Sequence, residues 1–112
     1  MPITALAAAL ALATAPAPDG AKTFTLQCAS CHGAKTTPMA PALAGVAGRP
    51  VASAPGFAYS AGLKAKGGVW SDDRLDAFLT SPMAFAPGTR MPTAVADPAR
   101  RAAIVDYLKT LK

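Results

Sequence analysis

Cys28-Ala29-Ser30-Cys31-His32 is the stretch with the strongest structural signal in this 112-residue chain. It has the form C-x-x-C-H, which is the pattern of covalent haem attachment. Two thiols near the end of a helix can each bond one vinyl side of a porphyrin, and the histidine that follows can then reach the iron. The chain has two cysteines and one histidine, so it offers one place for such a site. The motif predicts one haem c, bound through Cys28 and Cys31, with His32 as an iron ligand.

Three other interpretations of the two cysteines are weighed against haem attachment. A redox-active dithiol of the thioredoxin kind is expected within a βαβ unit, and the sequence has no convincing strand pattern. A zinc site needs further Cys or His ligands, and none remain in the chain. A structural disulfide between Cys28 and Cys31 would be strained, because only two residues separate the thiols.

The composition indicates that the chain needs help to build a core. Hydrophobic residues make up 52% of it, yet 28 of them are alanine and only 21 are Leu, Ile, Val or Phe. Proline and glycine add 20 residues that interrupt regular structure. A single small domain with so few large apolar side chains usually depends on a disulfide, a metal or a cofactor. These figures argue against a large enzyme with a deep substrate cleft.

The charge balance favours a protein partner over nucleic acid. The chain has 11 basic and 6 acidic residues, a formal net charge of +5. The basic residues are scattered, and the aromatic residues do not interleave with them as a base-stacking surface would require. We therefore expect redox protein partners that carry acidic docking patches, and no nucleic acid.

The N-terminal segment indicates export. Ile3–Ala15 is an uncharged apolar run, too short to span a bilayer, which takes about 20 residues. It fits the hydrophobic part of a signal peptide, although Met1–Pro2 lacks a basic residue and proline follows each candidate cleavage site. A membrane tether and a disordered tail are the alternatives. We assign residues 1–18 to a signal peptide or tether and 19–112 to the folded domain, in the periplasm or another extracytoplasmic compartment.

Helix signals follow one another along the folded part, and each predicted helix begins at an Asp or Ser that can cap it. The last also has a proline at its first position, which suits a helix start. With no convincing strand, the predicted class is all-α. The expected elements are Gly20–Ser30 capped by Asp19, a short helix from Ser60 to Gly67–Gly68, a helix from Ser71 to Pro82, a proline-rich loop Ser81–Ala96, and a last helix from Asp97-Pro98.

Several stretches agree in order and spacing with one known family. They are Cys28–His32, Pro41–Gly45 leading to Gly48-Arg49, Pro55–Ser60, Gly67–Trp70, Pro87–Met91 and Tyr107–Lys109. On these residues the chain resembles a class I cytochrome c from about Gly20 to Leu111. The resemblance implies three main helices, short helices and long loops wrapped around one haem c. It also implies a monomer that carries one electron at a time between larger redox proteins. Such a carrier is not an enzyme.

The resemblance further implies roles for single residues. Met91, in the stretch Pro87–Met91, matches the sixth iron ligand, and Met83 is the second choice for that ligand. Met39 lies in the loop that is expected on the same side of the haem as His32. Pro41 matches a proline whose carbonyl accepts a hydrogen bond from the iron-binding histidine. Arg49, Tyr59 and Trp70 match residues that bind the haem propionates, and Thr89 is the expected polar neighbour of Met91. Leu63 and Phe78 stand where the family commonly has asparagine and tyrosine, so any water network near the methionine should be small.

Two functions compete with a freely diffusing carrier. The chain could be a tethered or subunit haem-c module of a dehydrogenase or oxidase complex. A peroxidase-like haem enzyme is the other alternative, and it would need an iron with an open coordination position, which ligation by both His32 and Met91 would not leave.

Overall fold

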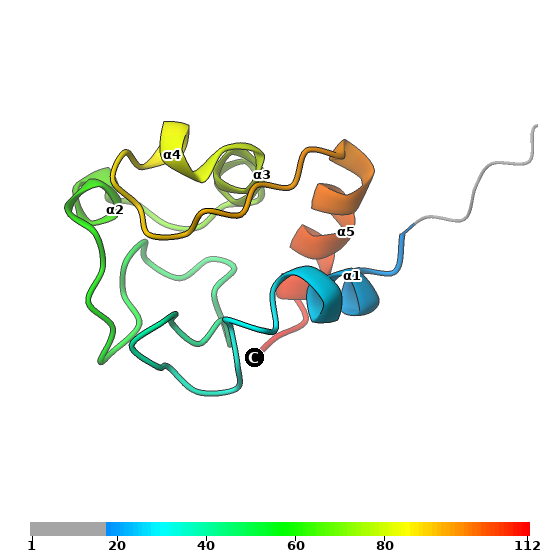
Figure 1. Ribbon diagram of the computed structural model, residues 1–112, viewed down its shortest axis with the longest axis horizontal. Helices are drawn as coiled ribbons and strands as arrows, with labels where there is room; N and C mark the ends of the chain where they lie inside the picture. Colours follow the sequence, from blue (N-terminus) through cyan, green and yellow to red (C-terminus); the bar gives the residue numbers. More distant parts are fainter. Residues whose placement is uncertain (1–17) are drawn as a thin grey trace, which may run out of the picture.

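The computed structural model describes residues 18–112, which form five helices joined by long loops (Figure 1). Within these residues no strand forms, and the one bridge pairs Pro50 with Val69. The prediction of an all-α fold is confirmed. The predicted signal peptide or tether, residues 1–18, lies outside the described part except for its last residue. No helix between residues 18 and 112 has the length and apolar character needed to cross a membrane. The helices are α1 (Gly20–Gln27), α2 (Ala61–Lys66), α3 (Asp72–Thr80), α4 (Pro82–Phe85) and α5 (Pro98–Leu108).

Four of the helices begin where their caps predicted. The side chains of Asp19, Ser60, Ser71 and Asp97 each accept a hydrogen bond from a backbone N–H in the first turn of the helix that follows. The first helix ends at Gln27, three residues earlier than predicted. Beyond it the chain turns, and the N–H of His32 donates to the carbonyl of Cys28 at 2.9 Å.

The prediction of an unbroken loop over Ser81–Ala96 is wrong, because α4 forms at its start. Ser81 ends α3, and its side chain then accepts a hydrogen bond from the N–H of Ala84 at 3.2 Å. Pro82 cannot donate the hydrogen bond that would continue α3, but it suits the first position of a new helix. The short helix packs Phe85 against Trp70, with 5.5 Å between the ring centroids.

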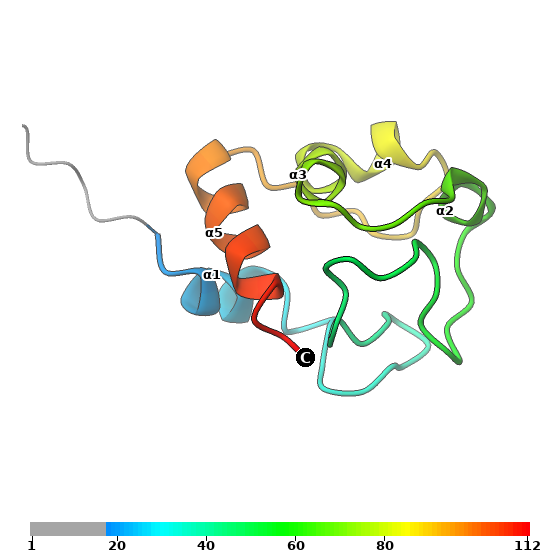
Figure 2. The ribbon, with the colours of Figure 1, turned by 180° about the vertical axis from the view of Figure 1, so that it is seen from behind.

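Helices α1, α3, α4 and α5 are joined by mutual packing, whereas the backbone of α2 lies close to none of the other described helices. Helix α1 crosses the C-terminal half of α5, where the rings of Phe24 and Tyr107 have centroids 5.1 Å apart (Figures 1 and 2). Helix α3 packs against both α4 and α5. Ile104 of α5 is the most deeply buried large side chain, and no polar or charged side chain of residues 18–112 is buried. These four helices support the loops and α2, which make up the rest of the described molecule.

Charges are unevenly distributed along the chain. Residues 20–71 contain five basic residues and no acidic one. The acidic residues are Asp19 and five aspartates in or beside α3 and α5, and four of these five pair with Arg100, Arg101 or Lys109. The net positive charge therefore lies on the loops and α2 (lower and left in Figure 1).

Candidate haem site

A cavity of about 300 Å³ lies between the loops and the helices. The loop after α1 and the loop that joins α4 to α5 lie at opposite sides of the molecule in both views, and side chains from both line the cavity (Figures 1 and 2). The walls are mostly apolar and come from α1, α2, α3, α5 and the loops between them. Every candidate site residue lines this cavity: Cys28, Cys31, His32, Pro41, Arg49, Tyr59, Trp70, Thr89 and Met91.

His32 has one ring nitrogen engaged and one available. Its Nδ1 lies 2.9 Å from the carbonyl oxygen of Pro41. A carbonyl can only accept, so Nδ1 carries the proton and donates it, and in the neutral imidazole Nε2 is then the nitrogen with a free lone pair. A hydrogen bond of this kind fixes the tautomer and the orientation of a metal-binding imidazole.

Both cysteines are free thiols within reach of the same cavity. Cys28 is half-buried and Cys31 is exposed. Burial raises the pKa of the Cys28 thiol above its ordinary value, and the neighbouring Cys31 raises it further. Over residues 18–112 no three His, Cys, Asp or Glu side chains gather into a set that could hold a metal ion. The zinc interpretation therefore finds no support in this part of the chain.

The described methionines differ in their relation to the cavity. Met91 lines it and is partly buried, and its N–H donates to the hydroxyl of Thr89 at 3.4 Å. Met83 is 54% exposed and does not line it. Met39 lines it but is 68% exposed. The geometry thus favours Met91 over Met83 as the sulfur donor.

One wall of the cavity offers hydrogen-bond donors without acceptors. Arg49 directs its two terminal nitrogens to the carbonyls of Ala42 and Ala44, while its Nε is buried and has no partner. The Tyr59 hydroxyl accepts from the N–H of Ala54 at 2.9 Å, so its own proton remains to be donated. Buried donors are normally satisfied, and a carboxylate of a bound group would satisfy both.

Trp70 forms part of an apolar wall next to these donors. Backbone hydrogen bonds join Trp70 to Gly48 and to Arg49, which keeps the indole and the guanidinium in adjacent positions. The indole is buried and packs on Phe78, with 5.3 Å between the centroids. Phe85, from the helix that the sequence did not predict, completes this aromatic cluster. Leu63 lines the cavity as well, so both apolar departures from the family pattern lie in or beside this wall.

The residues that line the cavity fit a covalently bound haem. They supply two thiols, an imidazole with a free Nε2, a thioether, unpaired donors for carboxylates and apolar surface for a porphyrin ring. This donor set matches the known protein ligands of haem iron.

Comparisons with known proteins agree with this fit. The sequence model of a family described as cytochrome c matches residues 17–112. Cytochrome c-type cyt cy of Rhodobacter capsulatus is 39% identical over 100 residues, which are 88% of this chain and 50% of that protein. A cytochrome c homolog of Rickettsia felis is 42% identical over 96 residues, 82% of this chain and 55% of that protein. Cytochrome c of Euglena viridis is 38% identical over 96 residues, 83% of this chain and 94% of that protein.

A solved structure extends the similarity to three dimensions. Cytochrome cH from Methylobacterium extorquens superposes with a TM-score of 0.75 at 35% sequence identity, covering 83% of this chain and 99% of that one. The chain spans about half the length of the Rhodobacter and Rickettsia proteins that it matches.

Proposed function

Because this chain belongs to the cytochrome c family, we propose that it carries single electrons between larger redox proteins by means of one haem c. The observation that carries the proposal is that Cys28, Cys31, Met91 and a His32 whose Nδ1 is held by the Pro41 carbonyl all line one apolar cavity. Haem c, when bound there, supplies one iron that changes between the ferric and ferrous states.

The protein's residues would hold the group at three places. Cys28 and Cys31 would bind the porphyrin through their sulfur atoms, and His32 and Met91 would ligate the iron. The hydrogen bond from His32 to the Pro41 carbonyl would fix the orientation of the imidazole and so hold Nε2 ready to bind the iron. The unpaired Nε of Arg49 and the hydroxyl of Tyr59 would neutralise the propionates, beside the indole of Trp70.

The surroundings suit rapid exchange of one electron. Leu63, Phe78 and Leu79 line the cavity with apolar surface, which would limit the access of water to the iron. Two protein ligands leave no coordination position for a substrate, so the chain would catalyse no reaction alone. A peroxidase-like enzyme requires that open position. Carbon monoxide separates the two functions, because a reduced protein closed by Met91 should resist it.

The working environment of the protein is part of the same proposal. Residues 19–112 would form the carrier domain, exposed to an extracytoplasmic compartment, with residues 1–18 acting as a signal peptide or a tether. Partners would present acidic patches to the positive loops, and the domain would act as a monomer. A module fixed in a dehydrogenase or oxidase complex is the alternative. Membrane fractionation of the native protein, with its mature N-terminus sequenced, distinguishes a diffusing carrier from a fixed module.

Visible spectra of the oxidised and reduced protein test the ligand set. We expect haem-c bands in both states and a methionine-to-iron charge-transfer band in the ferric state. Met91→Ala should abolish that band, whereas Met83→Ala should keep it. A ferric protein without the band, or one whose band survives in Met91→Ala, would overturn ligation by Met91.

A further inference from the structure

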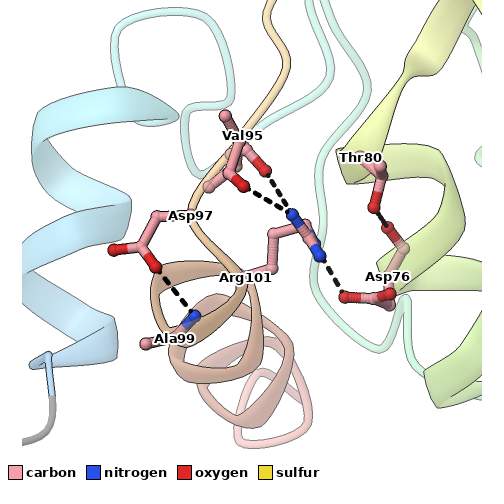
Figure 3. Close-up of polar contacts among 7 residues, drawn as sticks. Asp76, Thr80, Val95, Asp97, Ala99 and Arg101 are labelled. Carbon is pink, nitrogen blue, oxygen red and sulfur yellow. Dashed lines mark hydrogen bonds and ion pairs between the residues drawn. The ribbon is translucent and has the colours of Figure 1, made fainter.

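Arg101 ties three parts of the molecule together. Its side chain is 12% exposed, against 55% for Arg100 and 43% for Lys109 in the other ion pairs. Its Nε donates to a carboxylate oxygen of Asp76 at 2.9 Å. Its Nη1 donates to the carbonyls of Val95 and Ala96, each at 3.0 Å (Figure 3). Arg101 thus connects α5 to α3 and to the loop that leads away from Met91.

That loop is held to the rest of the protein at few points after Met91. Between residues 18 and 112 no backbone–backbone hydrogen bond involves Pro92, Thr93 or Ala94. Val95 is the first fixed residue after Met91: its N–H donates to the carbonyl of Leu79 at 2.8 Å, and its own carbonyl accepts from Arg101. Val95 is also 3% exposed and lines the same cavity as Met91.

The chemistry of arginine suits this task. A guanidinium is planar and presents several N–H groups in fixed directions, so it can bind Asp76 and two backbone carbonyls at once. The carboxylate of Asp76 also compensates a mostly buried positive charge and fixes the orientation of the fork. A lysine would keep the charge but could not direct N–H groups at Asp76 and at both backbone carbonyls in the same fixed arrangement.

We propose that Arg101 is a positioning residue that holds the Met91 loop (residues 86–97) closed and thereby keeps the methionine sulfur on the ferric iron. This inference rests on the proposed ligation by Met91. A thioether is a soft ligand and binds the harder ferric ion less strongly than the ferrous ion, so the ferric protein depends more on the loop. Without Arg101, the Val95 and Ala96 carbonyls lose their partner and the loop opens more easily.

Imidazole reports this opening, because it binds ferric iron only after the methionine has left. We expect Arg101→Ala to raise the imidazole affinity of the ferric holoprotein about tenfold, as the loss of hydrogen bonds to a charged group implies. Arg101→Lys and Asp76→Asn should raise it by smaller factors, because each keeps part of the contact. The two substitutions also keep the test usable if Arg101→Ala does not fold.

Two control variants separate positioning from general stability. Arg100→Ala removes the same charge from the neighbouring residue, whose ion pair at 3.7 Å is with Asp97, the N-cap residue of its own helix, whereas the Val95 and Ala96 carbonyls are bound by Arg101. Val105→Ala removes buried apolar surface from the same helix, at a residue that does not line the cavity. We expect Arg100→Ala to leave imidazole affinity unchanged, and Val105→Ala to lower the free energy of unfolding without raising that affinity.

A failure of this inference about Arg101 can be distinguished from a failure of the proposed ligation by Met91. If Arg101→Ala binds imidazole like the wild type, or if Val105→Ala raises the affinity as much at equal loss of stability, Arg101 does not position the loop. If the wild type shows no methionine-to-iron band, or Met91→Ala retains it, the ligation itself is wrong. A band that depends on Met91, together with an imidazole affinity that depends on Arg101 but not on Arg100, supports both.

Discussion

Gly20 of α1 lies directly against the backbone of Ala103 in α5. A Cβ atom on Gly20 would come within 2.2 Å of the Ala103 carbonyl oxygen and within 3.0 Å of the Tyr107 Cβ. The obstacle is backbone in the middle of a helix, so it cannot move aside as a flexible side chain would. The crossing of the two helices therefore depends on glycine, and it sets the position of Cys28, which follows α1 directly.

Gly20→Ala should destabilise the holoprotein by about 2 kcal/mol, the usual cost of overpacking a close contact. Denaturant unfolding followed by circular dichroism measures the change. Gly33→Ala is the matched control, because a Cβ there would meet no atom within 4 Å. Equal stability of the two variants would mean that the α1–α5 contact tolerates a methyl group.

The apoprotein should not fold on its own. Only 17 Leu, Ile, Val and Phe residues remain after Ala17, and core residues from three helices, such as Phe24, Leu75 and Ile104, line the cavity. Without the cofactor these side chains would face an empty space, which costs stability. Circular dichroism of Cys28→Ala/Cys31→Ala should show little helix and no cooperative thermal transition. A compact apoprotein with a cooperative transition would contradict this prediction.

Association with an acidic partner should slow as salt rises. The net positive charge of residues 20–71 would guide encounter, and we expect the rate constant to fall on the order of tenfold from low to physiological ionic strength. Stopped-flow measurements with Lys22→Gln and Lys35→Gln should show a weaker salt dependence. The control is Lys109→Gln, since Lys109 is already paired with Asp72 at 3.0 Å. Rates that do not respond to salt would indicate a mainly apolar contact.

At alkaline pH the methionine-to-ferric-iron band should persist, because the Met91 loop carries no lysine that could replace the sulfur. The chain has none between Lys66 and Lys109. The ammonium of Lys66 lies over the Phe85 ring, 4.2 Å from its centroid. A hydrogen bond to Asp72 raises the pKa of Lys109, so Lys109 stays protonated, and unable to bind iron, to a higher pH than a free lysine.

Arg90→Lys tests the alkaline prediction, because arginine keeps its charge at any ordinary pH and lysine does not. In this variant the pH at which half of the band is lost should fall by about one unit or more. Above that pH the spectrum should be that of a lysine-ligated haem. In the wild type the band should end only with hydroxide entry or unfolding. Lysine ligation in the wild type at moderately alkaline pH would show that the Met91 loop is less rigid than proposed.

The sequence predicted those features that depend on local chemistry. Asp19, Ser60, Ser71 and Asp97 marked helix starts because capping needs only the residue and the turn that follows it. The same rule applied to Ser81-Pro82 would have found α4, but a helix of four residues has no periodic pattern to draw attention to it. The motif and the family resemblance named the candidate site residues, and the structure lines one cavity with them.

Other features depend on distant parts of the chain and were not predictable. Arg100 and Arg101 are adjacent and chemically identical, and only the packing of α5 decides that Arg101 turns toward Asp76 and Val95. The need for glycine at position 20 arises from Ala103 in the last helix. The burial of the Arg49 Nε without a partner likewise depends on how the loop folds around it, which the sequence alone does not reveal.

The uneven distribution of charge gives the molecule an electric dipole. Its positive end lies over the loops and α2, and its negative end lies toward α3 and α5, where aspartates and basic residues nearly balance. In the field of an acidic surface such a dipole experiences a torque and turns before contact is made. The loop that contains His32 would lead the approach, and α3 and α5 would trail. Rotation during diffusion would thus reduce the number of unproductive collisions, independently of any single contact at the interface.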